Sequence, residues 1–257
     1  MAVRSVIEAP EAKIESIDRF TVGVLDAIAG HVPVVKFQSA CYERYGSAGI
    51  AVLHHGMEHA AALGIEVILD AKRGDIGLTA AHYSASARLA GADWTTVSPY
   101  LGFEPIQSFL DQGRGAFVLV RTSNPDSDAV QSLVLDDGRT VAEAMADLLV
   151  EAGAASIGEH GYSCLGAVVG ATKGADHVAL RARMPNQLFL VPGFGAQGAG
   201  LDDVLDCFNA DGRGAIVTSS RGIIYAAGED DAGWAEAVSD AAASFADQIG
   251  RATGLRS

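Results

Sequence analysis

Basic residues, cysteines and long apolar runs are all scarce in this chain of 257 residues. Lys and Arg number 18 against 32 Asp and Glu, which gives a formal net charge of −14 at pH 7. Sequence-independent binding of nucleic acid needs a basic surface, so this charge argues against nucleic acid as a partner. No apolar run reaches the length that crosses a bilayer, and the N-terminus lacks the basic-then-apolar pattern of a secretory signal. No membrane association is therefore expected.

The three cysteines, Cys41, Cys164 and Cys207, are scattered and form no C-x-x-C pair. Such an odd, dispersed set predicts neither a disulfide framework nor a thiolate metal site. Together with the missing signal pattern, it favours a cytoplasmic protein. Low-complexity segments and linkers are also absent, so residues 1–257 are expected to form a single domain.

The chain does contain many short apolar strands that alternate with helical patterns. Seven strands are predicted, at residues 32–37, 66–71, 94–98, 116–120, 165–169, 188–191 and 215–218. Helices are predicted from residue 16 to Gly30 and over 49–63, 79–90, 106–110, 140–153 and 234–249. This alternation is typical of βαβ units around a parallel sheet. Because the polar residues gather where strands end, the pattern favours a (β/α)8 barrel, which builds its active site there.

The most unusual stretch, residues 67–79, begins as a buried strand and then becomes charged with Asp70, Lys72, Arg73 and Asp75. Side chains alternate along a strand, so Asp70 and Lys72 are expected to share a face, and Gly74 is expected to let the chain turn. Buried ionised groups are costly unless they compensate one another. Opposite charges in this position therefore indicate a functional site; the alternative is an exposed salt-bridge cluster.

Two later segments have the composition of a phosphate site. Residues 192–198 read P-G-F-G-A-Q-G, which is a weak dinucleotide fingerprint because the required βαβ context is missing. A loop whose backbone N–H groups and Gln197 amide hold a phosphate fits better, although a loop without a ligand remains the alternative. Arg221 follows the last predicted strand, where its guanidinium could bind phosphate or join a surface ion pair.

Two further motifs allow a simple structural interpretation. Arg121-Thr-Ser-Asn-Pro125 offers hydroxyl and backbone donors suited to a polar ring edge such as a pyrimidine, or forms an Asx or Ser turn before the proline. His55 and His59 match the H-x-x-E-H pattern of a zinc-protease class. No third ligand accompanies them, so solvated helix histidines are the preferred interpretation and no metal site is expected.

Taken in order, these motifs resemble the orotidine 5'-phosphate decarboxylase family, in particular its bacterial subgroup with the longer chain. The resemblance spans roughly residues 16 to 226. It rests on D-A-K-R-G-D from Asp70, on R-T-S-N-P from Arg121, on V-V-G-A-T from Val168, on P-G-F-G-A-Q-G from Pro192, and on Lys36, Ile76, Thr79 and Arg221-Gly222. It implies a homodimeric (β/α)8 barrel that removes CO2 from orotidine 5'-phosphate to give UMP in pyrimidine biosynthesis, without metal or organic cofactor.

The resemblance also implies a role for each site residue. Lys72 would deliver the proton to C6, Asp70 would face the departing carboxylate, and Lys36 would hold Asp70 and the ribose. Asp75, Ile76 and Thr79 would enter the neighbouring subunit's site. Ser123 would bind the pyrimidine and Gln197 with Arg221 the phosphate, with Pro192 and Gly222 as further substrate-binding residues.

The sequence departs from the family pattern at its start. The family's first strand, which ends in a ribose-binding aspartate, should precede the helix at Ser16, but only Val3–Ile7 offers a weak substitute. The expectation is therefore an N-terminally shortened barrel that lacks strand one. A smaller departure is Ser98, where the subgroup has asparagine.

Two other functions stay open. One is a Mg²⁺-dependent sugar-phosphate decarboxylase or aldolase of the same superfamily, which shares the Asp-x-Lys-x-x-Asp core. Ser123 and the Gln197 loop argue against it. The other is a truncated, non-catalytic nucleotide-binding remnant.

Overall fold

The computed structural model describes residues 11–110, 114–195, 198–228 and 232–256. In these ranges, seven strands form a sheet whose order follows the chain, from β1 to β7. The strands are β1 Val34–Gln38, β2 Glu66–Arg73, β3 Trp94–Val97, β4 Gly115–Arg121, β5 Leu165–Val169, β6 Phe189–Val191 and β7 Ala215–Val217. The helices are α1 Glu11–Ile28, α2 Ser39–Glu43, α3 Gly46–Ala62, α4 Gly77–Leu89, α5 Gln107–Leu110, α6 Asp128–Gln131, α7 Val141–Gly153, α8 Gly174–Arg183, α9 Asp202–Leu205, α10 Arg221–Ile224 and α11 Trp234–Ala252.

The pairs β1–β2, β3–β4, β4–β5, β5–β6 and β6–β7 are all parallel, with helices between successive strands. This alternation confirms the predicted fold class, a (β/α) barrel, with seven strands in the described ranges. Residues 3–7, the weak substitute that the sequence offered for the family's first strand, lie outside the described residues. None of the helices in the described ranges has the length and apolar character needed to cross a membrane.

The chain divides into two compact units, and strand β2 passes from one to the other after Ala71. The first unit contains the chain up to Ala71 together with residues 87–93 and 220–248. The second unit contains residues 72–86, 94–219 and the C-terminal segment from Ile249. Each unit has a hydrophobic core of its own.

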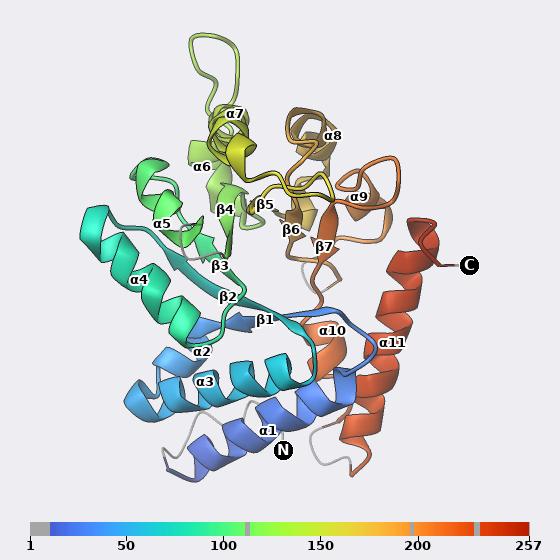
Figure 1. The fold of residues 1–257 in the computed structure, drawn as a ribbon. Helices are drawn as coiled ribbons and strands as arrows, with labels where there is room; N and C mark the ends of the chain where they lie inside the picture. Colours follow the sequence, from blue (N-terminus) through green and yellow to red (C-terminus); the bar gives the residue numbers. More distant parts are fainter. Residues whose placement is uncertain (1–10, 111–113, 196–197, 229–231, 257) are drawn as a thin grey trace. The chain divides into compact units, whose positions relative to one another are not determined.

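In the first unit, helices α1 and α3 lie side by side (Figure 1). Their apolar faces contribute Leu25 and Met57 to a core that also contains Val67 from β2. The ring of Trp234 in α11 stacks on Phe20 of α1, with 5.8 Å between the ring centroids. These contacts bury the apolar faces that the helical periodicity predicted.

The two histidines of the H-x-x-E-H pattern lie on α3 and face α1. His55 Nδ1 and His59 Nε2 are each 2.7 Å from an aspartate oxygen, Asp18 Oδ1 and Asp26 Oδ1 respectively. The hydrogen bond that the Asp18 carboxylate accepts raises the pKa of His55 above its ordinary value. The histidines therefore link two helices, a role that the solvated-histidine interpretation did not include.

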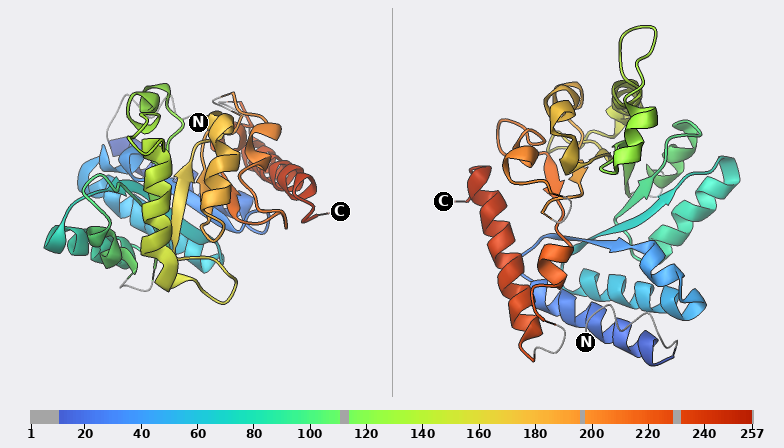
Figure 2. Two further views of the ribbon diagram at one scale, coloured as in Figure 1. Left: turned by 90° about the horizontal axis from the view of Figure 1, so that it is seen from above. Right: turned by 180° about the vertical axis from the view of Figure 1, so that it is seen from behind.

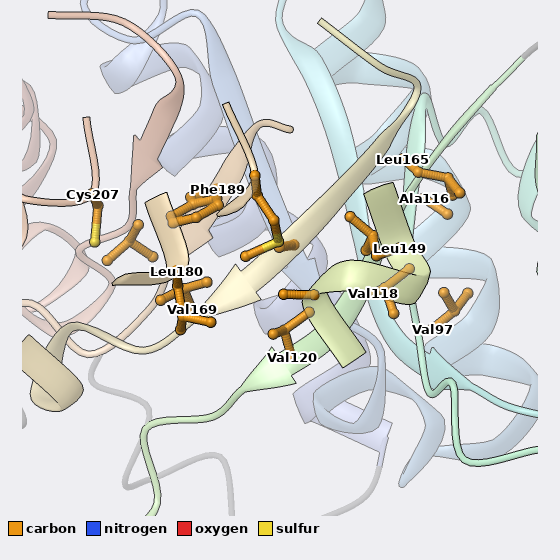
Figure 3. Close-up of a cluster of buried hydrophobic side chains, with 14 of the residues drawn as sticks. Val97, Ala116, Val118, Val120, Leu149, Leu165, Val169, Leu180, Phe189 and Cys207 are labelled. Carbon is orange, nitrogen blue, oxygen red and sulfur yellow. The ribbon is translucent and has the colours of Figure 1, made fainter. Parts of the chain in front are cut away.

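The second unit is built on strands β3 to β7, of which β3 to β6 are almost entirely buried and β7 is half-buried. Figure 3 shows its core, in which Val118 and Val120 of β4 lie near Leu149 of α7. Strands covered on both faces read as continuous apolar runs, which explains why the sequence located them well.

Helix α7 begins next to the predicted residue 140, and the structure shows a capping box there that the sequence analysis did not identify. The Thr140 hydroxyl accepts the Glu143 N–H, and a Glu143 carboxylate oxygen accepts the Thr140 N–H. Helices α7 and α8 lie alongside each other (Figure 2). Arg183 of α8 donates hydrogen bonds to Asp147 and Glu143 of α7. Helix α8 itself was not predicted individually, because its apolar stripe is short.

Candidate active site

Lys36 and Asp70 form an ion pair between two neighbouring strands in the first unit. The parallel register of β1 and β2 places Gln38 opposite Asp70, two residues beyond Lys36. Lys36 Nζ is 2.9 Å from Asp70 Oδ2, and the two side chains are only 14% and 9% exposed. Gln38 Nε2 donates to the Asp70 carbonyl at 3.3 Å. The structure thus brings together a buried cation and a buried carboxylate that lie 34 residues apart in the chain.

Arg221 and Gly222 also belong to the first unit, where they begin the short helix α10. Both residues are exposed. The guanidinium of Arg221 therefore keeps its hydrating water until a ligand replaces it. This suits a group that binds an anion, since its donors form a fixed planar fork.

Lys72 has a backbone conformation that the sequence did not reveal. Its φ is +46°, and it is the one non-glycine residue of the described ranges with a positive φ. That conformation costs a side-chain-bearing residue about 1–2 kcal/mol. The Lys72 N–H donates to Thr96 Oγ1 at 2.9 Å, and the Arg73 carbonyl accepts the Ser98 N–H at 2.7 Å. Contacts with the strand β3 segment therefore hold the lysine in this conformation.

Lys72 and Gly74 bear on two sequence expectations. The alternation rule that predicted a shared face for Asp70 and Lys72 assumes extended backbone, whereas Lys72 has a positive φ, so the shared face stays a prediction. Gly74 was expected to supply the turn, yet its φ is not positive and the positive-φ glycine is Gly77, with φ +50°. Gly74 instead provides room, because a Cβ there would lie 3.1 Å from Cβ of Ser98.

Residues 75–79 leave β2 and enter helix α4 in the second unit. Asp75 lies in the connecting loop, where its Oδ1 accepts the N–H of Ile76 at 2.8 Å. Ile76 is 59% exposed, and Thr79 in the first turn of α4 is also exposed. Asp75, Ile76 and Thr79 thus lie at the surface of their unit, where they could contact another molecule.

The loop that carries Ser123 is held by its own side chains. Ser127 Oγ donates to the carbonyl of Asn124 at 2.7 Å, and Gln131 Oε1 accepts the N–H of Thr122 at 2.8 Å. Ser123 itself is half-buried. Side chains that follow Pro125 therefore hold this loop, and the binding of a ligand by Ser123 stays a prediction.

Arg121, just before this loop, is the centre of a buried charge network that sequence reasoning did not single out. Its side chain is 6% exposed, and Nε and Nη2 each lie 2.6 Å from a carboxylate, Asp176 and Asp128 respectively. Lys173 Nζ is 2.6 Å from the same Asp128. Burial lowers the pKa of Arg121, but hydrogen bonds to Asp176 and Asp128 outweigh it and the net pKa is raised. Hydrogen bonds from Lys173 and then Arg121 lower the pKa of Asp128.

The glycine-rich loop begins at Pro192, directly after β6, in the second unit. Gly193, Gly195 and Gly198 all have positive φ, of 102°, 70° and 92°. The Gly195 N–H donates to the Ala199 carbonyl at 2.8 Å. Glycine is thus needed for the path of this loop. The predicted phosphate ligand Gln197 lies outside the described residues.

Thr96 is a residue that the sequence analysis missed. It is 1% exposed and supplies the hydroxyl that accepts the Lys72 N–H. Its position inside the apolar strand β3 gave one weak signal, because a buried hydroxyl needs a partner.

Comparison with known proteins gives a consistent result. The family model described as "Orotidine 5'-phosphate decarboxylase / HUMPS family" matches residues 16–237. The orotidine 5'-phosphate decarboxylase of Rhodopirellula baltica is 41% identical over 251 residues, covering 90% of this chain and 82% of the relative. That of Deinococcus radiodurans is 40% identical over 243 residues, covering 91% and 85%. The solved structure of Leishmania donovani OMP decarboxylase is similar with a TM-score of 0.79 and 31% identity, covering 96% of this chain and 90% of that one.

Proposed function

Because the chain belongs to the orotidine 5'-phosphate decarboxylase / HUMPS family, we propose that it decarboxylates orotidine 5'-phosphate to UMP, a step of pyrimidine biosynthesis. The observation that carries this proposal is the 41% identity to a decarboxylase over 90% of the chain. The largely buried ion pair of Lys36 and Asp70 on adjacent strands supports it, because such a pair suits a charged substrate.

In the proposed reaction, the bond between C6 of the pyrimidine and its carboxylate breaks, and CO2 leaves. The electron pair stays on C6, which has no electron sink to delocalise it. A fixed cation must therefore stabilise the charge as it forms, and the ammonium of Lys72 has this role. Lys72 Nζ then gives its proton to C6, which completes UMP.

Asp70 is the proposed neighbour of the substrate carboxylate. Lys36 Nζ, 2.9 Å away, holds this buried carboxylate in place. Repulsion between these two negative groups raises the free energy of the bound substrate. It raises that of the transition state less, because the carboxylate is there being lost as neutral CO2. Lys36 in addition contacts the ribose.

The remaining residues bind the parts of the substrate that do not react. Ser123 contacts the pyrimidine edge, while Gln197 and Arg221 bind the phosphate, with Pro192 and Gly222 beside them. Binding energy from a remote phosphate can lower the barrier of the chemical step, provided that it is realised in the transition state.

We further propose a homodimer with shared active sites, in which Asp75, Ile76 and Thr79 reach the partner's substrate. Large apolar side chains near this segment support the proposal, since Ile76 and Leu78 are 59% and 75% exposed. Tyr100 and Leu101, after β3 in the same unit, are 88% and 52% exposed. Exposed apolar groups in this number are typical of an interface with another protein chain.

A cytoplasmic location is proposed as well. The three cysteines are all unpaired, and Cys41 and Cys164 are exposed, which suits a reducing compartment. Fractionation of the producing cells would test it, and recovery with an extracytoplasmic fraction would overturn it.

The test of the proposed activity is turnover of orotidine 5'-phosphate by the purified chain, with UMP and CO2 quantified. We expect turnover that survives excess chelator. No turnover would favour a non-catalytic nucleotide-binding protein. Turnover of a sugar phosphate that chelator abolishes and Mg²⁺ restores would favour the magnesium-dependent alternative.

A further inference from the structure

The V-V-G-A-T motif has no assigned role, yet it touches two candidate substrate loops at once. Residues 170–172, which we call the coupling segment, follow β5 in the second unit. Ser123 and Pro192, which belong to the same unit, lie on either side of it in the hydrogen-bond pattern. The segment is therefore placed to set the position of the pyrimidine loop relative to the phosphate loop.

Gly170 is needed for space and not for conformation. Its φ of −71° and ψ of 134° are available to any residue. A Cβ at this position, however, would lie 2.6 Å from both the N and Cα atoms of Ser123, and 2.7 Å from its Cβ. Such separations do not occur between real atoms, and the neighbour here is backbone that has no rotamer to change. A side chain at residue 170 must therefore displace Ser123.

Hydrogen bonds connect the segment to both loops. Thr172 Oγ1 donates to the Ser123 carbonyl at 2.9 Å, and the Gly170 N–H donates to the Arg121 carbonyl at 2.7 Å. On the other side, the Ala171 N–H donates to the Pro192 carbonyl at 2.9 Å. Ala171 is fully buried, so this contact has no competing water. Three consecutive residues thus bridge the two loops.

Residues that follow the coupling segment hold it in place. His177 is fully buried, and its Nε2 is 2.9 Å from the Gly170 carbonyl. Lys173, the next residue, is paired with Asp128, which is also paired with Arg121. These contacts hold the coupling segment in place. A side chain added at residue 170 should therefore move Ser123 and not the segment itself.

We propose that Gly170 and Thr172 are positioning residues that place Ser123 against the pyrimidine ring at the correct distance from the phosphate loop. The proposal rests on the function argued above. It predicts that changes at these residues weaken recognition of the base and leave recognition of the sugar phosphate intact, because they act through Ser123.

The experiment uses calorimetry to measure how tightly UMP and ribose 5-phosphate bind to three variants, Gly170→Ala, Thr172→Val and Thr172→Ser. We expect Gly170→Ala to weaken the binding of UMP about tenfold or more. Thr172→Val loses one hydrogen bond and should weaken the binding of UMP about 3- to 10-fold. Thr172→Ser keeps the hydroxyl and should bind UMP as the wild type does. Ribose 5-phosphate should bind all three variants as it binds the wild type.

The background Ser123→Ala tests the route of the effect. In that background, Gly170→Ala and Thr172→Val should add little, because the contact they position is already gone. Gly166→Ala is the matched packing control, since its Cβ would crowd the Phe117 ring at 2.6 Å and not Ser123. Its folded fraction should bind UMP as the wild type does.

Equal weakening of UMP and ribose 5-phosphate, or undiminished effects in the Ser123→Ala background, would overturn the coupling role. Unchanged UMP binding in both Gly170→Ala and Thr172→Val would do so as well. If Gly170→Ala does not fold, the comparison of Thr172→Val with Thr172→Ser decides alone. Turnover of orotidine 5'-phosphate by the wild type separates these results from a failure of the proposed function.

Discussion

Lys36 Nζ, from the middle of strand β1, lies 2.9 Å from Asp70 Oδ2 of the neighbouring parallel strand β2. The pair is largely removed from water, so each charge is stabilised mainly by the other, more than in an ion pair at the surface. A fold that keeps such a pair between two of its strands has charged groups already in place for a charged ligand, even before the ligand binds.

Removal of one member of this pair should therefore destabilise the protein. We expect Lys36→Met to lower the free energy of unfolding by about 1–3 kcal/mol, because it leaves a buried acceptor without this partner. Lys36→Met/Asp70→Asn should regain part of that loss, yet neither variant should decarboxylate. Urea unfolding followed by circular dichroism measures both. A single variant as stable as the wild type would show that other groups compensate the Asp70 charge.

Lys72→Ala should abolish turnover while UMP binding largely persists. The ammonium acts on charge that exists only in the transition state, so its loss affects kcat and not ground-state binding. A positioned proton donor contributes about 10²- to 10⁴-fold. Single-turnover assays with parallel calorimetry measure the two effects. Retention of more than about a tenth of the wild-type kcat, roughly 1.4 kcal/mol in the barrier, would show that Lys72 is not the donor.

Arg221→Ala should lower kcat/KM for orotidine 5'-phosphate much more than for the dephosphorylated nucleoside. A charge-assisted contact is worth about 1.5–3 kcal/mol, so kcat/KM for the phosphorylated substrate should fall about 10- to 150-fold. The contact does not exist with the nucleoside. Arg213→Ala, which removes an exposed arginine elsewhere, is the control for lost charge. Equal losses for both substrates would place Arg221 away from the phosphate.

Mixing two inactive variants should partly restore activity if the sites are shared. In a heterodimer of Asp75→Asn and Lys72→Ala subunits, one site has both defects and the other has neither. Half of the dimers in an equal mixture are heterodimers, so about a quarter of the wild-type activity should return. Native mass spectrometry verifies the exchange of subunits. Exchange without recovered activity would contradict shared sites.

Cys207 should resist alkylation until the protein unfolds. It is fully buried, and burial raises the pKa of its thiol to about 12. At pH 8 only about one thiol in 10⁴ would then be the reactive thiolate, whereas Cys41 and Cys164 are exposed. Mass spectrometry after iodoacetamide treatment should find modification of those two in the native protein and of all three in urea. Native modification of Cys207 at the rate of Cys164 would refute the prediction.

The sequence by itself located the strands and most of the helices. Strand β5 has the predicted bounds, and helix α11 begins at the predicted Trp234. These features depend on apolar periodicity, so neighbouring residues suffice to define them. The start of α1 at Glu11, ahead of the predicted residue 16, was missed because residues 11–15 carry no clear apolar period.

The sequence also identified Lys36, Asp70, Lys72 and Ser123 as candidates, because ionised and hydroxyl groups at the ends of buried strands are unusual. Their geometry was decided by tertiary structure alone. The left-handed backbone of Lys72 accompanies a hydrogen bond to Thr96, 24 residues later in the chain. The need for glycine at residue 170 arises from Ser123, whose backbone lies where a Cβ would be. Both depend on which strands become neighbours, and a local pattern carries no information about the atoms that another strand places beside it.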